Sequence, residues 1–336
     1  MTGLAADQVS ESAAGPGRAE LEPQLERHRV ELAGYCYRML GSAFETDDAV
    51  QETLVRAWRG LDRFDGRSAL RSWLYRIATN VCIDMLNGRK RRALPMDLGS
   101  SPAPPVESAL GAPLPEYRWV EPIPNGRVMS GGVDPAEQAV SRESIRLAFV
   151  AALQYLPPRQ RAVLILREVL CWRASEVAEL LDTTEASVNS ALQRARSTLA
   201  GRDLAAARLP DPTDDTDKEL LARYVDAFER YDISSLVALL QEDAVQSMPP
   251  YEMWLRGRDD IARWLLGPGI GCRGSRLVPV EANGAPAFAQ YRPSPGGGHE
   301  PWSIQVIEVS DGRIAGFTHF LDTNLFAVFG LPPRLD

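Results

Sequence analysis

Eight prolines fall between residues 94 and 133, and they divide the helical part of the chain in two. Proline lacks a backbone N–H and its ring clashes with the preceding helical turn, so a packed helix is excluded there. Residues 22–93 and 134–200, on either side, have helical periodicity. A second stretch with prolines and acidic residues, 201–216, precedes a block of different character. The 336 residues therefore predict three folded blocks joined by two linkers.

The two ends of the chain differ in character. Residues 1–21 are rich in Ala, Gly, Glu and Ser and lack the apolar core of a signal peptide, so they predict a disordered tail. In the last block, residues 217–336, a helix leads into alternating stretches such as 302–309, which have the period of a strand. Asp311-Gly312 predicts a hairpin turn with a return strand at 313–320. We therefore expect this block to be α+β.

Composition excludes several classes of protein. Hydrophobic residues make up 45% and charged residues 24%, as in soluble globular proteins, and no apolar run approaches the ~18 residues of a membrane span. The four cysteines lie far apart without a C-x-x-C pair, which argues against a disulfide scaffold and a zinc site. Three scattered histidines are too few for a metal site. We expect a cytoplasmic protein without a metal or cofactor.

The positive charge is concentrated in one segment. Residues 56–92 hold ten basic and three acidic residues, a charge of +7 in a chain of −8. Aromatic residues are interleaved with these cations: Trp58, Phe64, Trp73 and Tyr75. Arginine with aromatic rings suits single-stranded nucleic acid, because Arg meets phosphate and rings receive unstacked bases. An aromatic core under an Arg-rich surface is the alternative that composition alone leaves open.

Residues 47–58 predict a two-faced helix. An apolar stripe at helical spacing is made by Val50, Leu54, Ala57 and Trp58. A second face carries Asp48, Gln51, Glu52 and Val55. By itself such a face is most simply a solvated surface.

Residues 173–199 predict a helix-turn-helix. A short helix at 174–181 is followed by the turn 182–185, whose side chains can cap a second helix at 186–199. That second helix directs Val188, Leu192, Ala195 and Leu199 inward. Its outward side chains are of the types that read adenine and guanine edges: Asn189, Ser190, Gln193, Arg194 and Arg196. A structural αα-hairpin is the alternative.

Both helical blocks resemble one family. Residues 63–80 look like conserved region 2 of bacterial sigma factors of the extracytoplasmic-function (group 4) class, and residues 47–58 match the helix by which that class binds core polymerase. Residues 156–163 and 187–196 are similar to region 4 of the same class. Many members carry a basic residue in place of Ala191, and often in place of Asn189, so the promoter element read is not transferable.

The resemblance implies roles for individual residues. Core RNA polymerase, through its β′ clamp helices, would meet Asp48, Gln51, Glu52 and Val55, and the β flap is a further expected contact. The −10 element of promoter DNA would be held by Phe64, Gly66, Arg67, Ser68, Ala69, Arg76 and Asn80. The −35 element would be read by Ser187, Asn189, Ser190, Gln193, Arg194 and Arg196.

The last block is similar to the SnoaL-like members of the NTF2-like fold, a curved sheet wrapped by helices into a cone. The pieces that carry the resemblance are residues 224–232, 254–261 and 311–314. A pocket could be lined by Tyr251, Trp254, Trp302 and His319. Some members are enzymes that pair His with Asp, but a period-two strand places residues 319 and 322 on opposite faces, which weakens that pairing here.

The expected architecture is two all-α sigma modules followed by an α+β cone domain. We expect a sigma factor that is not an enzyme and whose last block contacts the sigma modules and modulates them. Tyr117-Arg118-Trp119 would dock the first linker on polymerase or on the last block. A stand-alone helix-turn-helix regulator and a cyclase or isomerase are the alternatives. An anti-sigma partner, a ligand of the last block and the promoter sequence stay open.

Overall fold

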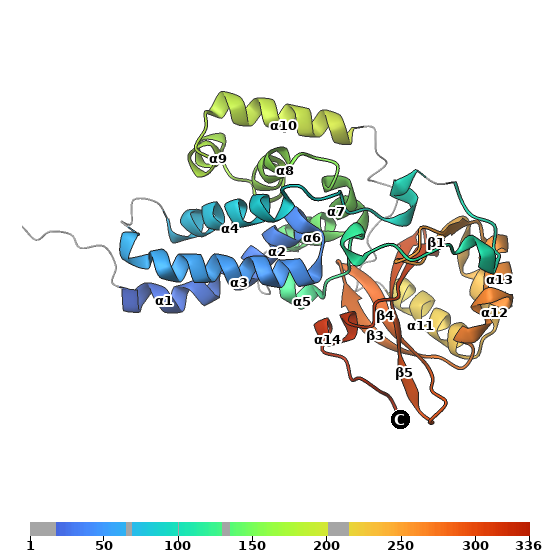
Figure 1. Ribbon diagram of the computed structural model, residues 1–336. Coiled ribbons are helices and arrows are strands. Elements are labelled where there is room, and N and C mark those ends of the chain that lie inside the picture. Colours follow the sequence, from blue (N-terminus) through green and yellow to red (C-terminus); the bar gives the residue numbers. More distant parts are fainter. Residues whose placement is uncertain (1–17, 65–68, 100, 130–134, 201–214) are drawn as a thin grey trace, which may run out of the picture.

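A computed structural model describes residues 18–64, 69–99, 101–129, 135–200 and 215–336. Two helical modules make one half of the molecule, and a domain of one sheet with flanking helices lies beside them (Figure 1). The segment between the helical modules crosses onto the sheet domain, where Ala103 and Leu114 donate to the backbone carbonyls of Trp254 and Pro250, and then returns to the first module (Figure 1). Within the described residues, no helix is long and apolar enough to cross a membrane.

The first helical module packs around buried tyrosines. Tyr35, Tyr37 and Tyr75 are fully buried, and Ser42 caps the third helix by accepting a hydrogen bond from the backbone of Glu45. Helix α1 begins at Arg18 and buries Leu21, so the prediction of a disordered tail up to residue 21 is wrong for its last residues. The elements are α1 (Arg18–Arg27), α2 (Arg29–Leu40), α3 (Ala43–Gly60), η1 (Leu61–Arg63) and α4 (Leu70–Leu86).

The proline-rich segment follows a fixed path along the molecule. A one-turn helix, α5 (Asn125–Val128), buries Val128, so the exclusion of a packed helix is wrong at this point. Pro124 directly precedes that turn, where its missing N–H costs no helical hydrogen bond. Three 3₁₀ turns precede it: η2 (Pro95–Leu98), η3 (Glu107–Ala109) and η4 (Glu116–Arg118).

The second helical module contains the predicted helix-turn-helix. The hydroxyl of Thr184 caps its second helix, accepting from the backbone N–H of Ser187 at 3.2 Å. Val188, Leu192, Ala195 and Leu199 are buried, which confirms the inward stripe. The elements are α6 (Pro135–Ile145), α7 (Leu147–Leu153), α8 (Pro158–Leu164), the π-helical turn η5 (Ile165–Val169), α9 (Ala174–Leu180) and α10 (Glu185–Leu199).

The last block is a six-stranded sheet in the order β2-β1-β6-β5-β4-β3. Asp311 and Gly312 both have positive φ, and Ser310 pairs with Arg313, which confirms the predicted hairpin. The helix that opens the block begins at Asp215, inside the predicted linker, and Asp215 and Asp217 suit the positive end of the helix dipole. The helices are α11 (Asp215–Glu229), α12 (Ile233–Ala238), α13 (Arg258–Leu266), η6 (Pro268–Cys272) and α14 (Leu325–Val328). The strands are β1 (Leu240–Ser247), β2 (Trp254–Arg256), β3 (Arg276–Ala282), β4 (Ala285–Pro293), β5 (His299–Ser310) and β6 (Arg313–Phe320).

The sheet belongs to two hydrophobic cores at once. Its inner face packs on α11, α12 and α13, through side chains such as Phe288 and Phe317. Its outer face, with Tyr291 and Ile304, belongs to a cluster that continues through both helical modules. The last block is therefore not an independent domain on a free linker, because apolar packing joins it to both helical modules.

Candidate nucleic-acid and partner interfaces

Helix α3 turns its predicted partner-binding face outward. Asp48 and Gln51 are exposed, while Glu52 and Val55 are half-buried. These four residues line one side of an open groove of about 430 Å³, and Val81, Asp84 and Met85 of α4 line the other. Arg56 spans the groove, with Nε 2.7 Å from Glu52 and Nη1 3.6 Å from Asp84. The structure thus brings the four predicted residues together on one accessible, acidic surface.

The predicted −10 residues divide into three groups. Gly66, Arg67 and Ser68 lie outside the described residues. Phe64 packs on Trp73 with ring centroids 5.1 Å apart, and Ala69 is the residue before α4. Arg76 and Asn80 are exposed one helical turn apart on α4. The helix therefore presents the two predicted DNA-contacting side chains on one stripe.

Part of that surface of α4 is already used inside the protein. Arg76 donates from Nη2 to the backbone carbonyl of Glu179 in α9, at 2.8 Å. The preceding residue, Tyr75, packs on Trp172, which precedes α9, with ring centroids 5.1 Å apart. The guanidinium of Arg71 lies 5.3 Å from the Tyr75 ring and 5.4 Å from the Trp172 ring. The helix-turn-helix thus covers one side of the basic, aromatic helix.

Sequence reasoning did not assign a role to Trp172. Its ring is 6% exposed although the residue lies in a loop, between η5 and α9. Amphipathic rings in loops commonly bury against another element. The only local signal was a tryptophan in the loop between two helices, and it does not name the partner.

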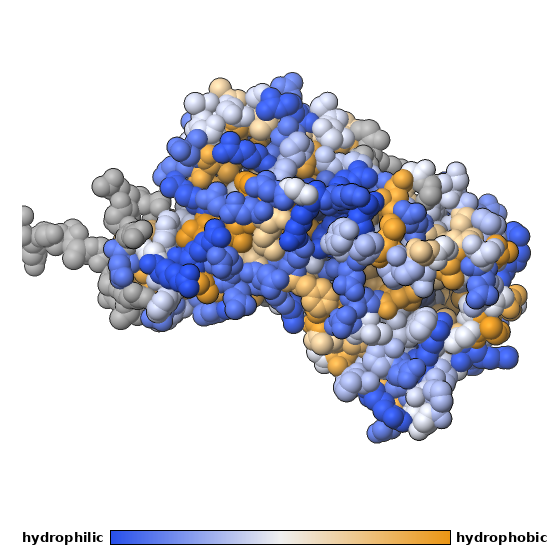
Figure 2. All heavy atoms as spheres, viewed as in Figure 1, coloured by the Kyte–Doolittle hydropathy of each residue, from blue (hydrophilic) through white to orange (hydrophobic). Residues whose placement is uncertain are grey.

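Helix α10 presents its predicted reading face to solvent. All six predicted −35 residues are exposed: Ser187, Asn189, Ser190, Gln193, Arg194 and Arg196. Arg194 donates to the hydroxyl of Ser190 at 2.7 Å, and Arg196 pairs with Glu168 at 2.5 Å. Helix α10 lies along the outer edge of the helical half (Figure 1). On the face that Figure 2 shows, hydrophilic side chains dominate that half.

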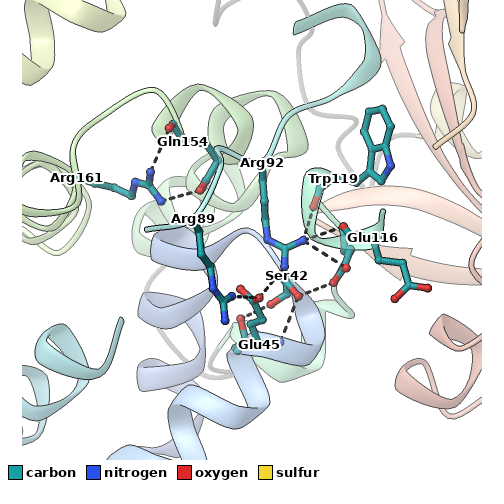
Figure 3. A network of polar contacts seen from close by, with 10 residues as sticks. Ser42, Glu45, Arg89, Arg92, Glu116, Trp119, Gln154 and Arg161 are labelled. Carbon is teal, nitrogen blue, oxygen red and sulfur yellow. Dashed lines mark hydrogen bonds and ion pairs between the residues drawn. The ribbon is translucent and has the colours of Figure 1, made fainter. Parts of the chain in front are cut away.

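A buried ionic network fixes the proline-rich segment against the first module (Figure 3). Glu121 accepts from the Ser42 hydroxyl at 2.6 Å, and an Arg92 nitrogen lies 3.5 Å from its carboxylate. Arg92 also pairs with Glu45 at 2.9 Å and donates to the carbonyl of Trp119 at 2.7 Å. Burial raises the pKa of Glu121 to about 7, against the opposing effect of the Arg92 charge. Trp119 is buried here while Tyr117 is exposed. The backbone carbonyls of Arg118 and Trp119 accept from Ala93 and Arg92 of the first module, a surface that the prediction of docking on polymerase or on the last block did not name.

One side chain ties the last block to both helical modules. Asn283, at the β3–β4 turn, donates to the Tyr37 hydroxyl at 2.6 Å and to the Ile145 carbonyl at 2.7 Å. Its side-chain oxygen accepts from the backbone of Ile123 at 3.0 Å. Asn283 is fully buried and has φ of +56°, a conformation that Asn tolerates better than most residues.

The four predicted pocket residues have separate surroundings. Trp302 stacks on the Arg292 guanidinium at 3.3 Å, and Trp254 offers its backbone carbonyl to Ala103 at 2.8 Å. Tyr251 is half-buried near the cis Pro249-Pro250 bond. A cavity of about 710 Å³ opens instead between α11 and the β3–β4 hairpin, and none of the four lines it.

His319 and Asp322 do not form an acid–base pair. His319 is buried on β6 against the Phe317 ring, and burial, together with the charge of Arg292, lowers its pKa to about 3. Asp322 follows the strand and accepts hydrogen bonds from the backbone and side chain of Asn324. Two groups held in such different surroundings do not provide the mutual geometry that general acid–base catalysis needs.

Comparison with known protein families gives three matches along the chain. Residues 25–92 match Sigma-70 region 2, residues 146–199 match Sigma-70, region 4, and residues 221–317 match the SnoaL-like domain. The first two matches contain α4 and α10, and the third contains the six-stranded sheet up to Phe317.

Similar curated proteins align over nearly the whole chain. The ECF RNA polymerase sigma factor SigG of Mycobacterium tuberculosis is 45% identical over 321 residues, which cover 95% of this chain and 85% of that protein. SigJ of the same organism, also an ECF RNA polymerase sigma factor, is 26% identical over 93% of this chain and 95% of that protein. The crystal structure of SigJ has the same fold, with a TM-score of 0.56 at 22% identity, covering 94% of this chain and all of that chain.

Proposed function

The chain belongs to the extracytoplasmic-function sigma factors of RNA polymerase and ends in a SnoaL-like domain, and on that premise we propose which partner each of its surfaces binds. The α3 face with Asp48, Gln51, Glu52 and Val55 holds the β′ clamp helices of core polymerase. The groove beside it supports this, because an acidic, partly apolar surface of this size suits a complementary basic helix. The β flap is a second contact, made through region 4.

The two promoter elements are read by α4 and α10. Asn80 and Arg76, with the preceding loop, contact the −10 element, and the polar face of α10 enters the major groove of the −35 element. The exposure of Asn189, Gln193 and Arg194 supports this role, because all three present groups that can pair with base edges. A stand-alone regulator is not favoured, because the resemblance includes region 2 as well as the helix-turn-helix.

The described arrangement is a closed state of the sigma factor. One observation carries this proposal: Arg76, a −10 contact, is bonded to the backbone of α9, the first helix of the helix-turn-helix. A single-stranded −10 element needs that side of α4 free. The −10 and −35 elements also lie well over one helical turn apart on DNA, whereas here the two reading modules pack directly on each other. Binding polymerase and promoter therefore requires the modules to separate.

The SnoaL-like domain modulates this opening through contact and has no catalytic role. Asn283 supports the proposal, because its three hydrogen bonds reach α2, the proline-rich segment and α6 together. A partner or ligand that prefers either state shifts the equilibrium by its difference in affinity for the two. The separation of His319 from Asp322 supports the absence of a catalytic role.

Asn283→Gly tests the closed state in the full chain. Glycine keeps the positive φ of the turn and removes all three side-chain hydrogen bonds. We expect proteolytic protection of residues 94–129 to fall, and transcription at limiting core polymerase to rise, because less energy is needed to open the variant. Asn324→Gly, on the exposed loop after β6, is the matched control. Unchanged protection together with unchanged transcription would contradict the proposal.

A further inference from the structure

A small basic pocket lies where the first module, the proline-rich segment and region 4 meet. Its volume is about 160 Å³, roughly the space of five water molecules. Five of its lining side chains are cationic: Arg89, Lys90, Arg91, Arg92 and Arg161. Glu45 is the one carboxylate among the lining residues. The pocket therefore has a large excess of positive charge that a bound anion would compensate.

Arg161 is the most unusual member of this wall. Its side chain is 4% exposed, and its hydrogen bonds go to neutral acceptors: the carbonyls of Met39, Gln154 and Leu156, and the side-chain oxygen of Gln154 at 2.6 Å. Its Nε has no partner among the described residues. A buried guanidinium without a carboxylate partner costs free energy unless an anion is supplied. Burial accordingly lowers the pKa of Arg161 to about 10.

The other cations differ in how far they are already occupied. Arg92 is held by Glu45 and Glu121, and Arg91 lies over the Tyr155 ring at 3.5 Å. Arg89 is exposed and shares Glu45 with Arg92. Lys90 is exposed and has no ion pair among the described residues. The donors open to an incoming group are therefore those of the exposed Arg89 and Lys90. The terminal nitrogens of Arg161 are already hydrogen-bonded, so Arg161 contributes its buried charge and one unpartnered Nε–H.

We propose that this pocket binds a phosphoryl group. Arginine donors in a fork match phosphate oxygens, and a lysine at the rim adds a point charge. The exposed ring of Tyr117 lines the same pocket and could stack on a nucleobase attached to the phosphate. The shared chemistry fits two sources: a free nucleotide or polyphosphate, and the phosphodiester backbone of DNA.

Such an anion would also join the two sigma modules. Arg89 and Lys90 follow α4 in the first module, whereas Arg161 lies on α8 of region 4. A ligand that bridges them binds the closed arrangement better than an open one, so it stabilises the closed arrangement by mass action. The pocket therefore couples phosphate binding to the availability of the promoter-reading surfaces.

Calorimetric titration of the full chain with pyrophosphate at constant ionic strength tests this site. We expect saturable binding of one pyrophosphate per chain, with slower hydrogen exchange in residues 86–92 and 156–158. The Arg89→Gln/Lys90→Gln variant should bind at least ~10-fold more weakly. The Arg230→Gln/Arg263→Gln variant is the matched control, because it removes two exposed arginines of the last block that each pair with a carboxylate three or four residues earlier in the chain.

The two sources are separated by competition. A duplex without promoter elements that displaces pyrophosphate from the wild-type chain assigns the site to the DNA backbone. Retention of pyrophosphate in the presence of the duplex assigns it to a free phosphorylated ligand. Binding that does not saturate, or that is equally strong in the Arg89→Gln/Lys90→Gln variant, overturns the proposal.

Discussion

At the scale of residues, burial changes the chemistry of Glu121. The residue is 7% exposed, and its charged surroundings are Arg92, Glu45 and Asp322. Because its folded pKa of about 7 lies above the unfolded value near 4.5, the folded chain holds an extra proton between these pH values. The contribution of Glu121 to the free energy of unfolding is therefore present at low pH and is lost as pH rises through about 7.

Glu121→Gln should remove this pH dependence. Glutamine resembles the protonated acid, so the variant should gain stability relative to the wild type between pH 5 and pH 8, by about 1–3 kcal/mol. Urea unfolding at the two pH values measures the difference. Glu116→Gln, an exposed acid of the same segment, is the control. A wild-type minus variant difference that is the same at both pH values would show that Glu121 is already ionised at pH 5.

At the scale of elements, we expect α10 to present two kinds of side chain to DNA: neutral ones for base edges and charged ones for phosphates. Gln193 is exposed and has no charge to offer a phosphate, whereas Arg196 carries a charge that is paired with Glu168 in this structure and suits a phosphate. Removing a bidentate base contact costs roughly 1–3 kcal/mol and does so only at the base concerned. A lost phosphate contact weakens all sequences alike.

Gln193→Ala should therefore relax discrimination at one or two positions of the −35 element, while Arg196→Ala lowers affinity uniformly. Affinities of the polymerase complex for a panel of single-base promoter variants give both results in one experiment. Thr198→Ala, further along the same helix, controls for changes in helix stability. A uniform loss for Gln193→Ala would place this residue on the backbone instead of on a base.

Local patterns in the sequence predicted local elements well. The apolar stripe of α10 and the Asp311-Gly312 hairpin follow from spacing alone, because the side chains that define them are neighbours in sequence. Long-range pairs could not be predicted in this way. Asn283 reaches Tyr37 across 246 positions, and nothing in the composition of either segment names the other. The fixed path of the proline-rich segment depends on such pairs, so prolines that exclude long helices were taken to exclude every packed helix.

The residues predicted for each surface lie together in the structure, whereas those predicted for the pocket come from separate segments. Polar residues on one helical face, such as Asp48 and Gln51, stay together because α3 is regular. Tyr251 and Trp302 come from separate segments whose relative placement depends on the curvature of the sheet and on the β4–β5 bulge. The basic pocket was missed because Arg161 approaches the first module from region 4, far from the cluster at residues 89–92 in sequence.

At the scale of the whole molecule, the shared core predicts cooperative unfolding. One hydrophobic cluster includes Tyr35 of the first module, Leu192 of region 4 and Ile304 of the sheet. Scanning calorimetry of the full chain should therefore give one transition, with equal calorimetric and van't Hoff enthalpies. Two resolved transitions, one of them unaffected by Asn283→Gly, would show that the last block unfolds independently.

The proline-rich segment is longer than the docked arrangement of the two sigma modules requires. While Glu121 and Trp119 are docked, the segment follows the surface and adds little reach. Once released, its 40 residues from 94 to 133 can span more than 100 Å at ~3.3 Å per residue. Undocking would thus increase the distance that can separate the two promoter-reading modules. Docking the released segment again carries a loop-closure cost of about 3 kcal/mol for a chain of that length. This cost opposes the return to the docked arrangement, so the released arrangement persists.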